Sequence, residues 1–232
     1  MNRNEPSIIP MRTQCRPFFP ICLLLVASVV FASQLVSARE EAPRPFERLE
    51  RCSLIPNEAN DGDSFHVRAK GKEYIFRLYF VDTPETENRF PERVQAQAKY
   101  FGITPDEAIR IGKIAAAFTR DKLAPKTFTV YTRWQDARGE SRLPRYYALV
   151  VVEDKQLAEL LVANGLARVF GQPANLPTGM HASAFEASLR TLEAKAKQNH
   201  LGAWSIHAPA SAKQPESSWE KRFPNRATTP AP

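Results

Sequence analysis

Cysteine is scarce in this chain of 232 residues, and the few cysteines present cannot cross-link the folded part. Cys15 and Cys22 lie in an N-terminal segment that is interpreted below as an export signal, so Cys52 alone remains in the rest of the chain. A single cysteine cannot form an intramolecular disulfide. The fold must therefore rely on an ordinary hydrophobic core, in which we expect Cys52 to be buried.

Histidine is equally scarce, and the four histidines are far apart in the sequence. No cysteine or histidine group has the spacing of zinc ligands, which excludes a zinc site of the common kinds. We predict that each histidine is a surface residue and neither a ligand nor a base. The four are His66, His181, His200 and His207.

Long apolar runs are missing too. The apolar run at 18–32 has 15 residues, whereas a membrane-spanning helix usually needs about 20. Arg3, Arg12 and Arg16 lie before or near its start, and the small residues at 36–38 follow it, as in a secretory signal. We therefore predict a signal peptide at 1–38 and a secreted or periplasmic protein. An uncleaved membrane anchor is the alternative.

Basic residues outnumber acidic ones by 32 to 25, a net charge of +7. Removing three arginines and one glutamate with the signal leaves 29 basic and 24 acidic residues, a net charge of +5. This suits a polyanionic partner, although it also serves simple solubility. A charged linker is expected at 39–46, one folded domain at 47–205, and a disordered tail rich in Pro, Ala, Ser and Thr at 206–232.

The remaining pattern predicts an α+β fold that is mainly β. Short strands are expected at 64–69, 73–81, 127–133, 145–152 and 166–170, with Lys70-Gly71 as a hairpin turn. Helices are expected at 91–101, from a Thr104–Glu107 capping box onward, at 156–164 and at 181–199. Five short strands with inserted helices indicate a small β-barrel with helical attachments.

Arg77 is the residue that most needs a chemical explanation. It lies among apolar residues in a strand that is expected to be buried, and a lone buried cation costs several kcal/mol. The hairpin turn places Arg77 opposite Ser64 and so next to Asp63. Strict alternation puts Asp82 on the opposite face, so Asp63 and Asp82 can meet only if the strand bends near Val81.

These residues resemble the staphylococcal nuclease (thermonuclease) family. The similar motifs are Asp61-Gly62-Asp63-Ser64, the run 77–86, Arg145 before an apolar strand, the run 161–167 and the run 201–205. Together they extend over about 54–205. The resemblance implies a five-stranded OB-type barrel with about three helices, and a calcium-dependent nuclease that cleaves DNA and RNA and releases the 5′ oxygen.

The resemblance also implies residue roles. Asp63 and Asp82 would bind Ca²⁺ through their carboxylates and Thr83 through its backbone carbonyl. Glu85 would orient or deprotonate the attacking water. Arg77 and Arg145 would be catalytic and would bind the scissile phosphate.

Two departures from the family pattern affect substrate contacts. Leu143-Pro144 precede Arg145, and the aromatic residues that contact a base are reduced to Phe170. Tyr146, Tyr147 and Phe170 are the candidates for base stacking. The chain also has extra sequence at about 88–102, which is expected to cover or reshape the cleft.

The leading hypothesis is an exported nuclease that acts as a monomer without an obligate protein partner, and that contacts a membrane only if its signal is uncleaved. The alternatives are a non-catalytic OB-type module that binds nucleic acid or protein, and an anchored structural domain. The carboxylates and arginines of the family pattern are all present, which favours the enzyme.

Overall fold

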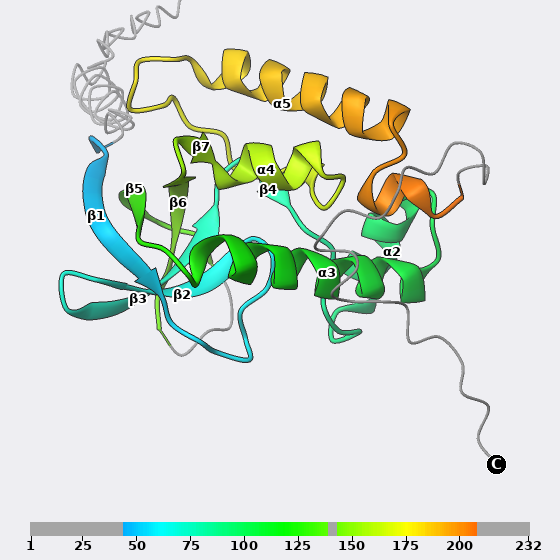
Figure 1. The fold of residues 1–232 in the computed structure, drawn as a ribbon, viewed down its shortest axis with the longest axis horizontal. Coiled ribbons are helices and arrows are strands. Elements are labelled where there is room, and N and C mark those ends of the chain that lie inside the picture. Colours follow the sequence, from blue (N-terminus) through cyan, green and yellow to red (C-terminus); the bar gives the residue numbers. More distant parts are fainter. Residues whose placement is uncertain (1–43, 139–142, 208–232) are drawn as a thin grey trace, which may run out of the picture. The chain divides into compact units, whose positions relative to one another are not determined.

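The computed structural model of this chain describes residues 44–138 and 143–207, and five strands in this part form a closed barrel (Figure 1). Neighbouring strands are antiparallel in the order β3-β2-β1-β5-β6, and a parallel pairing of β3 with β6 closes the barrel. The barrel strands are β1 (Glu47–Leu54), β2 (Ser64–Ala69), β3 (Lys72–Leu78), β5 (Phe128–Asp136) and β6 (Arg145–Val152). The short β7 (Lys155–Gln156) extends the sheet beside β6.

The β2–β3 hairpin has the predicted turn and register. Lys70 (φ 49°) and Gly71 (φ 74°) are both in the left-handed region, as a two-residue turn of this kind requires, and glycine adopts that region without strain. Ser64 pairs with Arg77, as predicted. The turn therefore fixes Arg77 beside the start of β2, next to Asp63.

The strand predicted at 73–81 is interrupted. β3 ends at Leu78. The next strand, β4 (Val81–Asp82), pairs with β8 (Arg168–Val169) and not with a strand of the barrel. The chain therefore leaves the barrel wall between Leu78 and Val81, and the bend lies next to the position that the sequence predicted.

Phe80 makes this bend. Its φ is +69°, a conformation that costs a non-glycine residue on the order of 1–3 kcal/mol. Its N–H donates to the Gln172 carbonyl (3.0 Å) and its carbonyl accepts from the Phe170 N–H (2.9 Å). The ring is buried with its centroid 5.0 Å from that of Phe185. These contacts offset the cost of the bend.

Four α-helices lie in the described residues: α2 (Pro91–Phe101), α3 (Pro105–Leu123), α4 (Leu157–Ala163) and α5 (Ala182–Gln198), with a short 3-10 helix at Gly202–Ser205. This is one more α-helix than the resemblance implies, and the additional one is α2 in the extra sequence. α3 begins with the predicted capping box between Thr104 and Glu107. α4 contacts both α3 and α5, and α2 packs against α3 (Figure 1).

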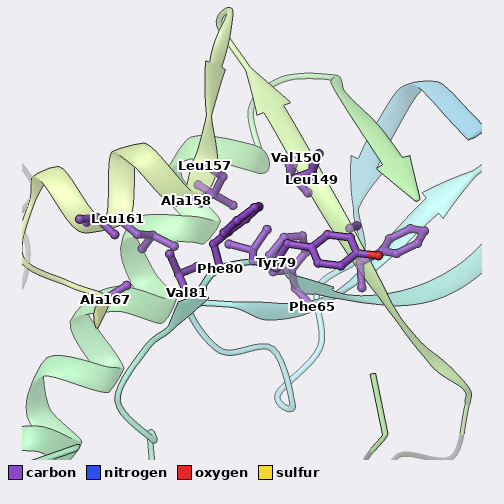
Figure 2. Packing of buried hydrophobic residues seen from close by; sticks show 14 of the residues in the cluster. Phe65, Tyr79, Phe80, Val81, Leu149, Val150, Leu157, Ala158, Leu161 and Ala167 are labelled. Carbon is purple, nitrogen blue, oxygen red and sulfur yellow. The ribbon is translucent and has the colours of Figure 1, made fainter. Parts of the chain in front are cut away.

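One buried cluster connects the barrel interior with the helices (Figure 2). Phe65 and Leu149 come from barrel strands, Phe80 and Val81 from the bend and β4, and Leu161 from α4. Cys52 is fully buried, as expected. Because the bend residues belong to the core, packing holds the segment that carries Asp82.

His66 is a correction to the sequence prediction. It is buried, not on the surface, with Nδ1 2.7 Å from the Asn60 side-chain oxygen. β2 is buried on both faces over most of its length, so the alternation that would expose His66 does not apply. Asn60 supplies the polar partner that a buried imidazole needs.

The predicted signal at 1–38, most of the linker at 39–46 and nearly all of the tail at 206–232 lie outside the described residues. Within residues 44–138 and 143–207, none of the helices combines the length and the apolar character of a membrane span.

Candidate active site

Asp61 and Gly62 build the acidic turn before β2. The Asp61 carboxylate accepts hydrogen bonds from the N–H groups of Asp63 (2.9 Å) and Ser64 (2.6 Å), which closes the turn. A Cβ at Gly62 would lie 2.7 Å from the Thr83 methyl group, so only glycine fits. Burial, and next the Asp63 carboxylate, raise the pKa of Asp61 to about 8. The turn directs the buried Asp63 side chain toward Thr83.

Arg77 joins two carboxylates that come from different elements. Its Nη1 lies 3.4 Å from Asp63 Oδ1, and its Nη2 lies 2.8 Å from Asp82 Oδ1. The bend at Phe80 makes this possible, because regular alternation would point Asp82 to the other face. Asp63, Arg77 and Asp82 therefore lie together, as the sequence analysis expected if the strand bends.

Thr83 adds backbone groups to the same cluster. Its N–H donates to Asp63 Oδ2 (2.8 Å). Its carbonyl accepts from Gln97 Nε2 (2.9 Å), which also donates to Asp82 Oδ2 (2.9 Å). Burial raises the pKa of Asp63, while Arg77 opposes this rise. The Asp82 carboxylate and the Thr83 carbonyl therefore lie close together, both within hydrogen-bonding distance of Gln97 Nε2.

Glu85 lies at the solvent side of this cluster, with its side chain 19% exposed. Its Oε1 is 2.8 Å from Arg93 Nη2, and its N–H donates to Gln97 Oε1 (2.9 Å). α3 approaches so closely that a Cβ at Gly112 would lie 2.2 Å from the Glu85 carbonyl oxygen. Burial raises the pKa of Glu85, and the charge of Arg93 opposes that rise.

Sequence reasoning missed the two residues that α2 contributes. Gln97 is fully buried, and its amide bonds Asp82, Thr83 and Glu85. Arg93 Nη2 lies 2.8 Å from both Asp82 Oδ1 and Glu85 Oε1. A signal for Gln97 was present, because it occupies a position in the apolar stripe of α2, where a polar residue needs a buried partner.

Arg145, the first residue of β6, reaches the site from the neighbouring strand. Its Nη1 lies 3.4 Å from the Ser64 hydroxyl, and its Nη2 donates to the Arg138 carbonyl. Burial, and next the charge of Arg77, lower the pKa of Arg145. Its Nε is buried and finds no hydrogen-bond partner among residues 44–138 and 143–207.

Arg168 is a further site residue that the sequence prediction did not include. Its Nε and Nη2 each lie 2.9 Å from Asp82 Oδ2, and the β4–β8 pairing places the two residues opposite each other. The argument used for Arg77 could have found it, since Arg168 is a lone cation between apolar residues.

Of the three predicted stacking residues, Phe170 lies beside Arg168 at the site, whereas Tyr146 and Tyr147 pack against other aromatic rings. The Phe170 ring is 59% exposed and has the Arg168 guanidinium carbon 4.4 Å from its centroid. Tyr146 instead packs edge-on against Trp134, with ring centroids 5.2 Å apart, and lies beside Phe76 in the sheet. Phe170 is therefore the best placed of the three for contact with a base.

The oxygens brought together here suit a hard divalent cation. Two carboxylates, Asp63 and Asp82, and the Thr83 carbonyl provide the oxygen ligands that calcium prefers. Side chains alone do not complete such a site, because the described part of the chain has no group of three or more His, Cys, Asp or Glu residues with metal-binding geometry. A cation here would need the carbonyl, and water would complete its coordination.

Comparison with known families agrees with this geometry. Residues 75–206 match the family described as staphylococcal nuclease homologue, so the chain belongs to that family. The match includes Arg77, the run 82–85 and Arg145, and it begins after Asp63. The barrel order is consistent with the OB-type fold expected from the resemblance. Membership indicates a nuclease-type hydrolase that binds nucleic acid.

Proposed function

We propose that this protein is an exported, calcium-dependent nuclease that hydrolyses phosphodiester bonds of DNA and RNA with release of the 5′ oxygen. The observation that carries the proposal is the contact of Arg77 with both Asp63 and Asp82, beside Glu85. It joins carboxylates suited to a hard cation with a guanidinium suited to a phosphate.

The metal would be held by the carboxylates of Asp63 and Asp82 and by the carbonyl of Thr83. When bound, calcium supplies positive charge that stabilises the phosphate in the transition state. Arg77 binds the phosphate through its planar guanidinium, and Arg145 does the same from β6. The position of Arg145 supports this role, because its Nη1 lies 3.4 Å from the hydroxyl of Ser64, the residue next to Asp63.

Glu85 is the residue suited to orient the attacking water and to take its proton. Its position at the edge of the cluster gives it access to solvent. A carboxylate whose pKa lies above its ordinary value is a stronger base than a free one. In the structure the Arg93 guanidinium contacts Oε1 of Glu85. It would have to move away from Oε1 before a water molecule could approach that oxygen.

Substrate contacts beyond the phosphate are proposed for Phe170, whose exposed ring can stack on a base regardless of sequence. Such stacking does not select a particular base, which agrees with action on both DNA and RNA.

The proposal that the protein is exported rests on the segment 1–38 alone. We expect a secreted or periplasmic protein, and an anchored one is the alternative. A monomer without an obligate protein partner remains our prediction.

The test is a digestion assay with the protein expressed from the full-length sequence. With calcium it should degrade denatured DNA and RNA, and a chelator should stop the reaction. The alternative function is a module that binds nucleic acid without cleaving it. Retained binding in a filter assay, with no cleavage at any calcium concentration, would establish that alternative.

A further inference from the structure

Three carboxylates and three guanidinium groups form one connected cluster at the site. Every link is a direct contact between charged groups, and the formal charges cancel. The contacts are Arg77 with Asp63 and Asp82, Arg93 with Asp82 and Glu85, and Arg168 with Asp82.

Arg93 differs from the other two arginines in its access to solvent. Its side chain is 42% exposed, compared with 13% for Arg77 and 11% for Arg168. Both of its contacts use the single nitrogen Nη2, whereas Arg168 meets Asp82 through two nitrogens and also lies over the Phe170 ring. Arg93 is therefore the guanidinium that can leave the cluster at the lowest cost.

Arg93 also occupies the oxygens that a metal-bound site would use. Its Nη2 lies 2.8 Å from Asp82 Oδ1 and 2.8 Å from Glu85 Oε1, so it bridges a candidate metal ligand and the candidate base. A divalent cation added to a neutral cluster leaves an excess of positive charge, and like charges a few ångströms apart repel strongly in a partly buried site. Removal of one guanidinium relieves this repulsion.

We propose that Arg93 is a resident counter-cation, which holds Asp82 and Glu85 in place without metal and which calcium must displace. This inference rests on the proposed function in that it takes the metal to be calcium at Asp63, Asp82 and Thr83. Arg93 then raises the calcium concentration at which the site fills. A residue that only supported the site structurally would have the opposite effect on metal affinity.

The test is calorimetric titration of the full-length protein with calcium chloride. R93Q should bind calcium at least about tenfold more tightly than the wild type, because the competing positive charge is gone. K99Q is the matched control, because it removes a positive charge from the exposed surface of the same helix. K99Q should change the affinity less than twofold. Unchanged or weaker binding by R93Q would overturn the proposal.

A second measurement keeps the proposal testable if R93Q does not fold. In ¹⁵N-labelled wild-type protein, the Arg93 Nε–H signal, assigned by its loss in R93K, should move toward the position of exposed arginines as calcium is added. A signal that stays in place while calcium binds would overturn the proposal. Both measurements read metal binding, so a protein that binds calcium as predicted but cuts no nucleic acid would contradict only the proposed function.

Discussion

The barrel wall and helix α2 contribute to the same site in different ways. Asp63, Arg77 and Arg145 lie at the ends or edges of barrel strands, where pairing fixes their positions within the sheet. Arg93 and Gln97 come from one face of α2 and reach the site only because α2 packs against α3. In the proposed function the first group would bind phosphate and metal, and the second group contacts Asp82, Thr83 and Glu85 from outside the barrel.

This difference suggests that a helix outside the barrel can support the proposed site without supplying its metal ligands or phosphate contacts. Gln97 donates both amide hydrogens to Asp82 and Thr83 and accepts from the Glu85 N–H, so it acts on the orientation of groups that would bind metal or water. Substitution of a barrel residue should therefore remove a catalytic or ligand-binding group from the proposed site. Substitution of an α2 residue should change the calcium affinity or the orientation of the metal ligands and leave some nuclease activity.

The largest effect is expected for Arg77→Lys. The substitution keeps a positive charge but loses the planar fork that contacts Asp63 and Asp82 and that can bind a phosphate at two points. We expect kcat to fall about 100-fold or more, the typical loss when one donor to the transition state is removed. Steady-state kinetics on a single-stranded oligonucleotide measures it, with calcium affinity as the control for an intact metal site. Full activity in this variant would disprove the phosphate role.

A smaller effect is expected for Gln97→Leu. The apolar side chain has a similar size but removes the hydrogen bonds of Gln97 to the Thr83 carbonyl and the Glu85 N–H, and leaves Asp82 Oδ2 with Arg168 alone. Calcium affinity should fall about 10- to 100-fold, as is usual for residues that orient metal ligands. Gln95→Leu is the matched control on the exposed side of α2 and should leave the affinity unchanged. Equal effects of the two variants would mean that α2 does not contribute through Gln97.

The same comparison explains what the sequence could predict. The register of Arg77 against Ser64 followed from a two-residue turn, and the Thr104 capping box from local spacing, because both depend on neighbouring residues. The bend was predicted only because two acids had to meet. Its cause lies at Phe80, whose unfavourable φ depends on pairing with residues about ninety positions later.

Arg93 and Arg168, which the sequence analysis missed, also depend on contacts between residues that are distant in the sequence. Arg93 and Arg168 meet Asp82 from segments 11 and 86 residues away in sequence, and no local pattern encodes such contacts. Tyr146 was considered for stacking because the family's aromatic residues are reduced here, but in the fold it packs against Trp134. His66 was assigned to the surface although β2 is buried on both faces.

A modest effect is expected for Phe170→Ala. Stacking of a base on an aromatic ring contributes on the order of 1–3 kcal/mol, and the exposed Phe170 should be at the lower end of that range. KM for single-stranded DNA should rise about fivefold with little change in kcat. Phe90→Ala, which truncates another exposed aromatic residue, serves as the comparison. A fall in kcat with unchanged KM would argue against a binding role.

A separate effect, outside the comparison of catalytic and binding roles, concerns stability without metal. The pKa of Asp61 rises from 3.8 to about 8 in the folded protein. The folded state therefore holds this proton where the unfolded state has lost it, and this contribution to stability declines as pH rises from about 4 to about 8. Thermal melting in chelator should show this decline, and Asp61→Asn, which keeps the turn acceptor, should reduce it. A decline of equal size in Asp61→Asn would assign it to other groups.

The central claim is that Asp63, Arg77, Asp82 and Glu85 form a calcium-dependent phosphodiesterase centre. The most direct measurement is the analysis of product ends after the full-length protein has acted on end-labelled RNA and single-stranded DNA, with calcium and with chelator. We expect cleavage only with calcium, with products that carry a 3′-phosphate and a 5′-hydroxyl. Binding of both nucleic acids without any cleavage, or cleavage that continues in chelator, would contradict the account.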